Sequence, residues 1–114
     1  MRIAYHAEFA NDINRFAAQY ADISERLKDR FRVEVDVAIA KIQDSPSGAG
    51  HFISTGSVII REARRRNLPS FPFFVLYSVD AELLLYGALI PKASDPLTWL
   101  RRLGNVGLQT EYKG

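Results

Sequence analysis

The sequence predicts one domain of the α+β class, in which an N-terminal helix hairpin packs on a small antiparallel sheet and a short C-terminal helix follows. Two observations lead to this fold. Apolar residues recur at helical spacing over residues 7–42 without Pro or Gly, and strand-like apolar runs begin at residue 51. With 114 residues the chain is long enough for one such core and too short for two. We therefore expect a single domain over residues 1–114, with 105–114 as a flexible tail.

The helical half divides into two amphipathic segments. Asp22, followed three residues later by Glu25, predicts an N-cap with a capping box, so the break should lie near residues 21–22 and the helices should form an antiparallel hairpin. Val33 and Val37 fall off the buried face of the second helix and are expected at the surface, as ordinary scattered apolar residues or, alternatively, as a contact with a partner. The apolar positions are Phe9, Ile13, Phe16 and Tyr20 in the first segment, and Ile23, Leu27, Phe31, Val35, Ala38 and Ile42 in the second.

The remaining segments are predicted as loop and strands. Residues 3–5 form a candidate edge strand, and Pro46 with two nearby glycines predicts a loop over residues 45–50. Strands are expected over 51–54 and 58–66, the second starting in the core and finishing in water. Side chains alternate along a strand, so one face would carry Glu62, Arg64 and Arg66 and the other Arg61, Ala63 and Arg65.

Two apolar runs, 73–79 and 82–90, are typical of strands in the middle of a sheet because both of their faces are apolar. The connection at residues 80–81 is short enough for an antiparallel hairpin. Asp95-Pro96 then predicts the N-cap and first turn of a short helix that ends at Gly104.

Composition places the chain among ordinary soluble globular proteins, with 47% hydrophobic and 25% charged residues. The absence of Cys excludes disulfides and thiol chemistry and agrees with a reducing compartment. No apolar run is long enough to cross a bilayer, and the charges in residues 1–8 are unlike a signal peptide. We therefore expect a cytoplasmic protein without a membrane partner.

The charge is uneven along the chain. Residues 1–56 carry 7 Lys and Arg against 8 Asp and Glu, whereas residues 57–114 carry 8 against 5. A positive second half favours an anionic partner, such as nucleic acid or an acidic protein segment, although a solvated surface has the same composition. Guanidinium groups bind phosphate and aromatic rings stack on unpaired bases, a combination that suits single-stranded RNA. The candidate partner-binding residues are Arg61, Arg64, Arg65, Arg66, Lys92, Trp99, Arg101 and Arg102.

Hydrolytic and metal chemistry are poorly provided for. His6 and His51 are the only histidines, and neither has a visible nucleophile or carboxylate partner in the sequence. No group of potential ligands has metal-site spacing, so we expect neither a metal nor a cofactor, and no catalytic residue is assigned. Tyr77 and Tyr86 lie inside strongly apolar strands and are expected in the core rather than in a site.

Several short motifs extend over most of the chain in a recognisable order. They are Arg30-Phe31 with residues 35–42 and Ser45-Pro46, then Gly50-His51-Phe52, residues 64–68, Phe71-Pro72-Phe73, and Asp95-Pro96 with Trp99. Together they resemble the RelE/ParE superfamily, the toxins of bacterial type II toxin-antitoxin (plasmid stabilisation) modules. The resemblance implies a helix hairpin on a small antiparallel sheet, and growth inhibition that a small cognate antitoxin neutralises by folding over the toxin.

The resemblance also implies one of two targets. RelE-like toxins cleave mRNA in the ribosomal A site with basic residues and often a Tyr, whereas ParE-like toxins bind DNA gyrase. This chain has Ile90-Pro91-Lys92 where many relatives have a His, Phe74 where some have another His, and Lys92 and Trp99 where ribosome-dependent nucleases place an Arg and then a Tyr. Tryptophan cannot exchange a proton, so the acid-base role would be unfilled.

We therefore expect a non-enzymatic toxin that is ParE-like or of unassigned target. The alternatives are a RelE-like ribosome-dependent mRNA interferase and an inert, toxin-derived partner-binding domain. Under these hypotheses the partners are a cognate antitoxin and either DNA gyrase or the ribosome with its mRNA. The assembly would be a homodimer or a hetero-oligomer with the antitoxin.

Overall fold

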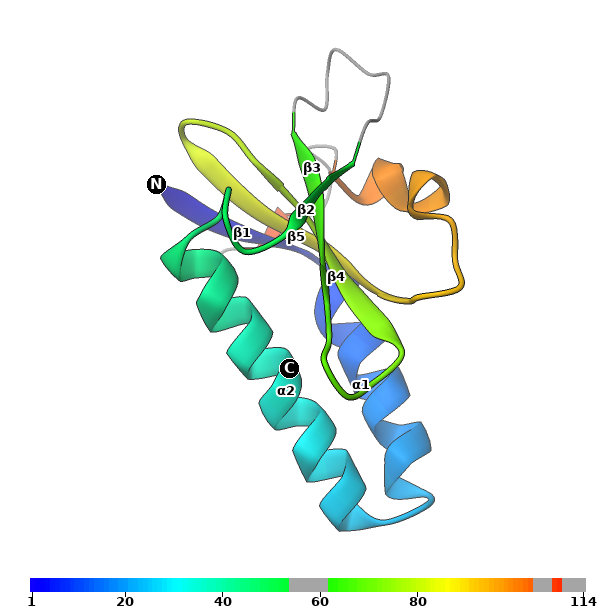
Figure 1. Cartoon of the computed structure of the whole chain (residues 1–114). Helices are drawn as coiled ribbons and strands as arrows, with labels where there is room; N and C mark the ends of the chain where they lie inside the picture. The colour runs from blue at the N-terminus through cyan, green and yellow to red at the C-terminus, as the bar shows by residue number, and fades with distance from the viewer. Residues whose placement is uncertain (54–61, 104–107, 110–114) are drawn as a thin grey trace.

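The computed structural model describes residues 1–53, 62–103 and 108–109, and within these ranges the chain is α+β (Figure 1). No helix in this part of the chain is long and apolar enough to span a membrane. The elements are β1 (Arg2–His6), α1 (Phe9–Ala21), α2 (Glu25–Asp44), β2 (His51–Ile53), β3 (Ala63–Asn67), β4 (Phe73–Val79), β5 (Leu83–Pro91), the 3-10 helix η1 (Pro96–Leu103) and β6 (Leu108–Gln109).

The described strands form one mixed sheet in the order β2-β3-β4-β5-β1-β6. β4 and β5 are central and form the predicted antiparallel hairpin. The predicted edge position of residues 3–5 was wrong, because β1 lies parallel to β5 and has β6 on its other side. Three apolar residues indicate a strand but carry no information on its neighbours, which here come from about 80 residues (β5) and about 100 residues (β6) further along the chain. The prediction of a flexible tail was wrong for Leu108 and Gln109, which pair with β1, and the other residues of 105–114 lie outside the described ranges.

The helix hairpin covers one face of the sheet (Figure 1), and its break lies slightly later than predicted. Asp22 has helical backbone angles and ends α1, whereas Ser24 is extended and caps α2 by accepting a hydrogen bond from the Leu27 amide at 3.0 Å. The predicted N-cap at Asp22 was therefore wrong by two residues. An N-cap residue that accepts a side-chain hydrogen bond typically has extended backbone angles, which Ser24 has and Asp22 does not.

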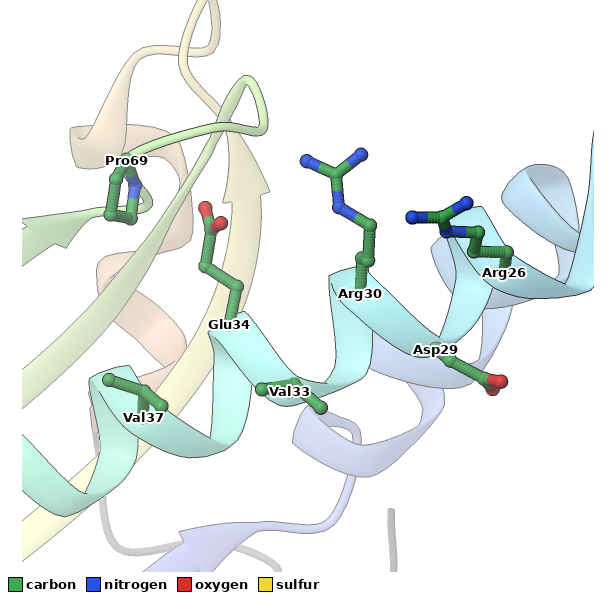
Figure 2. Close-up of a pocket in the computed structure, with 7 residues that line it drawn as sticks. All are labelled: Arg26, Asp29, Arg30, Val33, Glu34, Val37 and Pro69. Carbon is green, nitrogen blue, oxygen red and sulfur yellow. The ribbon is translucent and has the colours of Figure 1, made fainter.

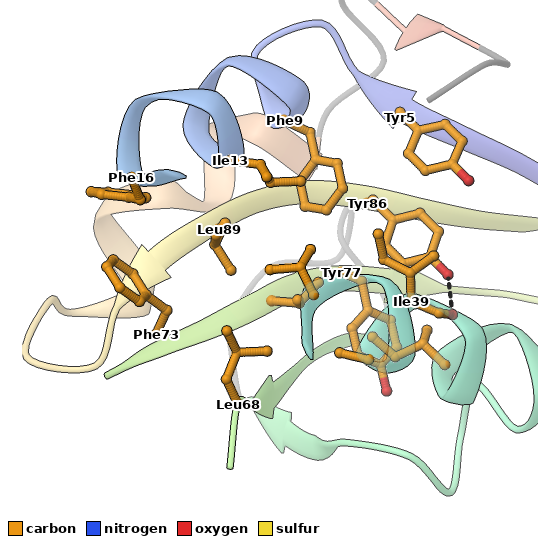
Figure 3. Close-up of a cluster of buried hydrophobic side chains, with 14 of the residues drawn as sticks. Tyr5, Phe9, Ile13, Phe16, Ile39, Leu68, Phe73, Tyr77, Tyr86 and Leu89 are labelled. Atoms are coloured by element: carbon orange, nitrogen blue, oxygen red, sulfur yellow. Dashed lines mark hydrogen bonds between the residues drawn. The ribbon is translucent and has the colours of Figure 1, made fainter. Parts of the chain in front are cut away.

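Between the helices and the sheet lies a core rich in aromatic rings (Figure 3). The Tyr5 and Tyr86 rings stack with centroids 5.0 Å apart, and Phe16 lies 4.4 Å from Phe73. Tyr77 and Tyr86 are fully buried, which confirms that they belong to the core. The Tyr86 hydroxyl donates to the carbonyl oxygen of Ile39 at 3.0 Å and thereby joins β5 to α2.

The opposite face of the sheet has a smaller core covered by η1. A bulge in β5 lies opposite the Leu76–Tyr77 step of β4, so Gly87 is the extra residue between Tyr86 and Ala88. A Cβ on Gly87 would lie 2.7 Å from Leu103 Cδ2, so the glycine lets η1 approach the sheet closely. The apolar residues of this second core include Phe74, Leu76, Leu85, Ala88, Ile90 and Leu103.

Candidate functional site

The basic run on β3 is divided between the two faces of the sheet. Arg64 pairs in register with Tyr77, which faces the helices, whereas Arg65 lies over Phe74 in the second core. Successive side chains of a strand point to opposite faces, so Arg66 lies on the same side as Arg64. The predicted alternation along this strand is therefore present over the described residues, and the three arginines do not form one continuous patch.

Arg64 and Arg66 bind the loop that follows α2. The Arg64 Nη1 donates to the Gly50 carbonyl oxygen at 2.8 Å, and its Nε donates to Glu62 at 2.6 Å. Arg66 Nη1 donates to the Ala49 carbonyl oxygen at 2.6 Å. These guanidinium groups therefore hold the chain's own backbone, which reduces what they can offer to an anionic partner.

Tyr77 completes this attachment from β4. Its hydroxyl donates to the Pro46 carbonyl oxygen at 2.7 Å, and burial raises the pKa of Tyr77 to about 12, partly opposed by the nearby arginines. A Cβ on Gly50 would lie 2.5 Å from the Tyr77 hydroxyl and 2.8 Å from the Arg65 carbonyl oxygen. The loop therefore needs glycine at this position because strand and loop backbones approach so closely.

Arg65 occupies the face away from the helices. Its guanidinium carbon lies 3.8 Å from the centroid of the Phe74 ring, and its Nη2 donates to the Asn67 side chain at 3.0 Å. Trp99 packs against the same second core from η1 and is partly buried. This face therefore combines a half-buried guanidinium with an indole, both resting on the apolar sheet surface.

Arg102, in contrast, is a buried structural residue. It is only 9% exposed, and its guanidinium binds Asp12 of α1, with Nη1 2.9 Å from Oδ2. Arg102 also donates to the Gly87 carbonyl oxygen at 3.3 Å, and Asp12 accepts a hydrogen bond from the Leu89 amide at 3.1 Å. β5 pairs with β1 only as far as Tyr86, so the Asp12–Arg102 pair satisfies β5 backbone groups beyond that ladder. Arg102 was predicted to belong to an accessible basic patch, and its burial differs from that prediction because charge alone does not reveal a buried partner 90 residues away.

The other predicted residues lie at the periphery. Lys92 and Arg101 are exposed, and the Lys92 amide donates to the Pro72 carbonyl oxygen at 2.9 Å, just beyond the end of the β4–β5 ladder. Arg61 lies outside the described residues. Some described residues of the predicted set have side chains that are partly or fully accessible and are not bound to the chain's own backbone carbonyl groups. They are Arg65, Lys92, Trp99 and Arg101.

His6 lies at the end of β1, close enough to the Asp12–Arg102 pair to feel both charges. Its Nδ1 accepts a hydrogen bond from the Glu8 amide at 3.0 Å. Burial and the charge of Arg102 lower the pKa of His6, partly opposed by Glu8 and Asp12. The described residues contain no group of three or more His, Cys, Asp or Glu side chains that could hold a metal ion.

A groove on the outer side of α2 was not assigned as a site from the sequence. It has a volume of about 720 Å³ and lies between α2 and Pro69 of the β3–β4 connection. Its apolar floor includes Val33 and Val37, the residues predicted to fall off the buried helix face, and both are exposed. The exposed valines were the sequence signal for this surface.

No protein-family profile, curated protein or solved structure matches this chain.

Proposed function

We propose that the chain is the toxin of a type II toxin-antitoxin module, and that it inhibits growth by binding its target rather than by cleaving RNA. Its target is DNA gyrase, as for ParE-like toxins, or another cytoplasmic macromolecule not yet assigned. A cognate antitoxin neutralises it. The basis is the motif order of the sequence together with an α+β fold whose helices cover one face of a mixed sheet.

The observation that carries the binding mechanism is the state of the proton-exchanging groups. The hydroxyls of Tyr77 and Tyr86 are committed to backbone carbonyl oxygens in the core, and burial raises the pKa of each. A general base must be able to reach the 2′-hydroxyl of its substrate and to change its protonation state near neutral pH. Neither tyrosine meets that requirement, and Trp99 cannot meet it by chemistry.

One observation favours RelE-like mRNA cleavage as a second candidate. Arg65 and Trp99 lie on the sheet face away from the helices, where a single strand could stack and bind through its phosphates. Lys92 and Arg101 would add positive charge against a developing phosphorane. This candidate requires proton-transfer groups other than Tyr77, Tyr86 and Trp99, supplied by this chain or by the ribosome.

Expression of the full chain in a bacterial host separates the two mechanisms. We expect DNA breaks that depend on gyrase to appear before translation stops, and A-site mRNA to stay intact. Lys92→Ala should leave toxicity in place, as should Lys41→Ala, an exposed lysine on α2 that serves as the matched control. Site-specific mRNA cleavage that Lys92→Ala abolishes and both Trp99→Phe and Lys41→Ala preserve would replace this proposal with the RelE-like one.

The neutralisation part of the proposal has its own test. A short reading frame beside the gene should encode a partner that binds the chain and restores growth when both are expressed. Absence of such a reading frame, or a chain that does not inhibit growth when expressed alone, would instead support an inert toxin-derived domain.

A further inference from the structure

The outer face of α2 carries a stripe of residues that the chain itself leaves uncovered (Figure 2). Val33 is 61% exposed and Val37 46% exposed, so two large apolar side chains are adjacent on the surface of one helix. The stripe advances by alternate steps of four and three residues, the spacing of a coiled-coil seam. Its members are Arg26, Arg30, Val33, Val37, Ala40 and Asp44.

We propose that this stripe is a self-association surface on which a second copy of the chain docks, with the two α2 helices antiparallel. The two-fold axis passes midway between Val33 and Val37. In an interface of this symmetry each residue meets the same counterpart on both sides of the axis. Val33 of one copy then faces Val37 of the other, and Arg26 faces Asp44.

Charge complementarity identifies the second copy as the occupant. The stripe is cationic at its N-terminal end, with Arg26 and Arg30, and anionic at its C-terminal end, with Asp44. It therefore matches itself when reversed, whereas a parallel arrangement would place Arg26 against Arg26. In the antiparallel arrangement Arg30 lies over Ala40, whose small side chain leaves room for the arginine stem.

The direction of these charges along α2 is a second observation. A helix stabilises anions at its N-terminus and cations at its C-terminus, so Arg26 and Asp44 both oppose the helix macrodipole. Neither residue forms an ion pair or a side-chain hydrogen bond within the described part of the chain. An antiparallel second copy places an aspartate beside Arg26 and an arginine beside Asp44, which removes the unfavourable arrangement at both ends.

The interface is small, which determines how strong the association should be. The stripe covers 19 residues of α2, or about 27 Å at the rise of an α-helix. One helix pair is at the low end of specific interfaces, so we expect a dissociation constant of roughly 10⁻⁵ M. The dimer would form at high local concentration and would compete with any partner that covers the same face.

Sedimentation equilibrium on the full chain tests the association. We expect a reversible monomer–dimer equilibrium, and Val37→Glu should raise the dissociation constant on the order of a hundredfold because each dimer loses two apolar contacts and gains two buried charges. Ile23→Glu is the matched control, since Ile23 is 73% exposed and precedes α2. It should leave the equilibrium unchanged.

A charge exchange tests the antiparallel register. Arg26→Asp and Asp44→Arg should each weaken self-association by roughly tenfold, because each replaces two attractive contacts with two repulsive ones. An equimolar mixture of these two variants should dimerise at least as well as the unaltered chain, since every pair at both ends is then of opposite charge. Circular dichroism on each variant verifies that the fold is retained.

Three results would overturn the proposal. If the chain stays monomeric at all accessible concentrations, it has no self-association surface on α2. If Val37→Glu also prevents antitoxin binding in that case, this face of α2 binds the antitoxin instead. A dimer that Val37→Glu does not weaken uses another surface. A mixture of Arg26→Asp and Asp44→Arg that stays monomeric while each folds would exclude the antiparallel register. None of these measurements depends on toxicity, so the proposed function can fail without affecting them.

Discussion

The two faces of the sheet are built differently. The face under the helix hairpin holds the large aromatic core, and its polar atoms are bound internally, with the Tyr77 and Tyr86 hydroxyls on backbone carbonyl oxygens. The face under η1 has a smaller core that includes three alanines, and a half-buried arginine lies over Phe74. One face is therefore used for stability, and the other keeps a charged, partly accessible surface.

This difference separates residues that are adjacent in the sequence. Arg64 and Arg66 serve the helix-covered side by holding the loop at residues 46–50, while Arg65 between them serves the other side. A run of like charges therefore has no single role once it lies on a strand, because alternation sends its members to different environments. Mutations on the two sides should have effects of different kinds.

The largest expected effect is at the pair that joins the two layers. Asp12→Ala leaves the buried Arg102 guanidinium and the Leu89 amide without their partner, so the free energy of unfolding should fall by about 3–5 kcal/mol. Urea denaturation measures this. Asp36→Ala, an exposed carboxylate on α2, should change stability by less than about 0.5 kcal/mol. Equal effects from the two variants would mean that Asp12 does not hold the layers together.

The second effect is a loss of folding stability at alkaline pH, caused by a tyrosine buried on the helix-covered face of the sheet. Burial raises the pKa of Tyr77 to about 12 from the ordinary value of 10.0, so the folded chain keeps a proton that the unfolded chain releases. Stability should therefore be unaffected below pH 10 and fall between pH 10 and pH 12, by at most about 1.4 kcal/mol per pH unit for each such tyrosine. Tyr77→Phe should reduce this slope, and an unchanged slope would exclude Tyr77 as a source.

Removing one hydroxyl from the same face should have a smaller effect at neutral pH. Tyr86→Phe keeps the ring stacked on Tyr5 but leaves the Ile39 carbonyl oxygen without this donor, which should cost about 1 kcal/mol. Thermal unfolding measures the change. Tyr20→Phe is a suitable control because the Tyr20 side chain is only partly buried and makes ring contacts in the same core. If both variants lost equal stability, the bond to Ile39 would contribute nothing specific.

The smallest effect on stability is expected on the opposite face of the sheet. A substitution there should affect target binding more than the free energy of unfolding. Arg65→Ala removes a cation–π contact with Phe74 at a partly accessible position, so stability should fall by only about 0.5–1 kcal/mol. Under the proposed function, target binding should weaken as well. Arg66→Ala provides the comparison, because its guanidinium holds the Ala49 carbonyl oxygen on the other side. If Arg66→Ala weakened target binding more than Arg65→Ala does, the helix-covered face and not the face under η1 would be the one that binds the target.

The sequence by itself determined the elements whose signal is local. The helix hairpin follows from apolar spacing between residues 7 and 42, and the β4–β5 hairpin from two apolar runs with a short connection. The exposure of Val33 and Val37 and the burial of Tyr77 and Tyr86 were also predictable, since each depends on the face of its own element.

Only the tertiary structure decided the features that join distant segments. The parallel pairing of β1 with β5 and the burial of Arg102 against Asp12 both depend on where the chain returns after many residues. A charged side chain has the same local sequence signal in water as in a buried pair, and a three-residue strand pairs equally well with several neighbours. Tertiary packing selects among these options because it satisfies the backbone groups of β5. The neighbour of β1 and the partner of Arg102 therefore cannot be predicted from the local sequence pattern.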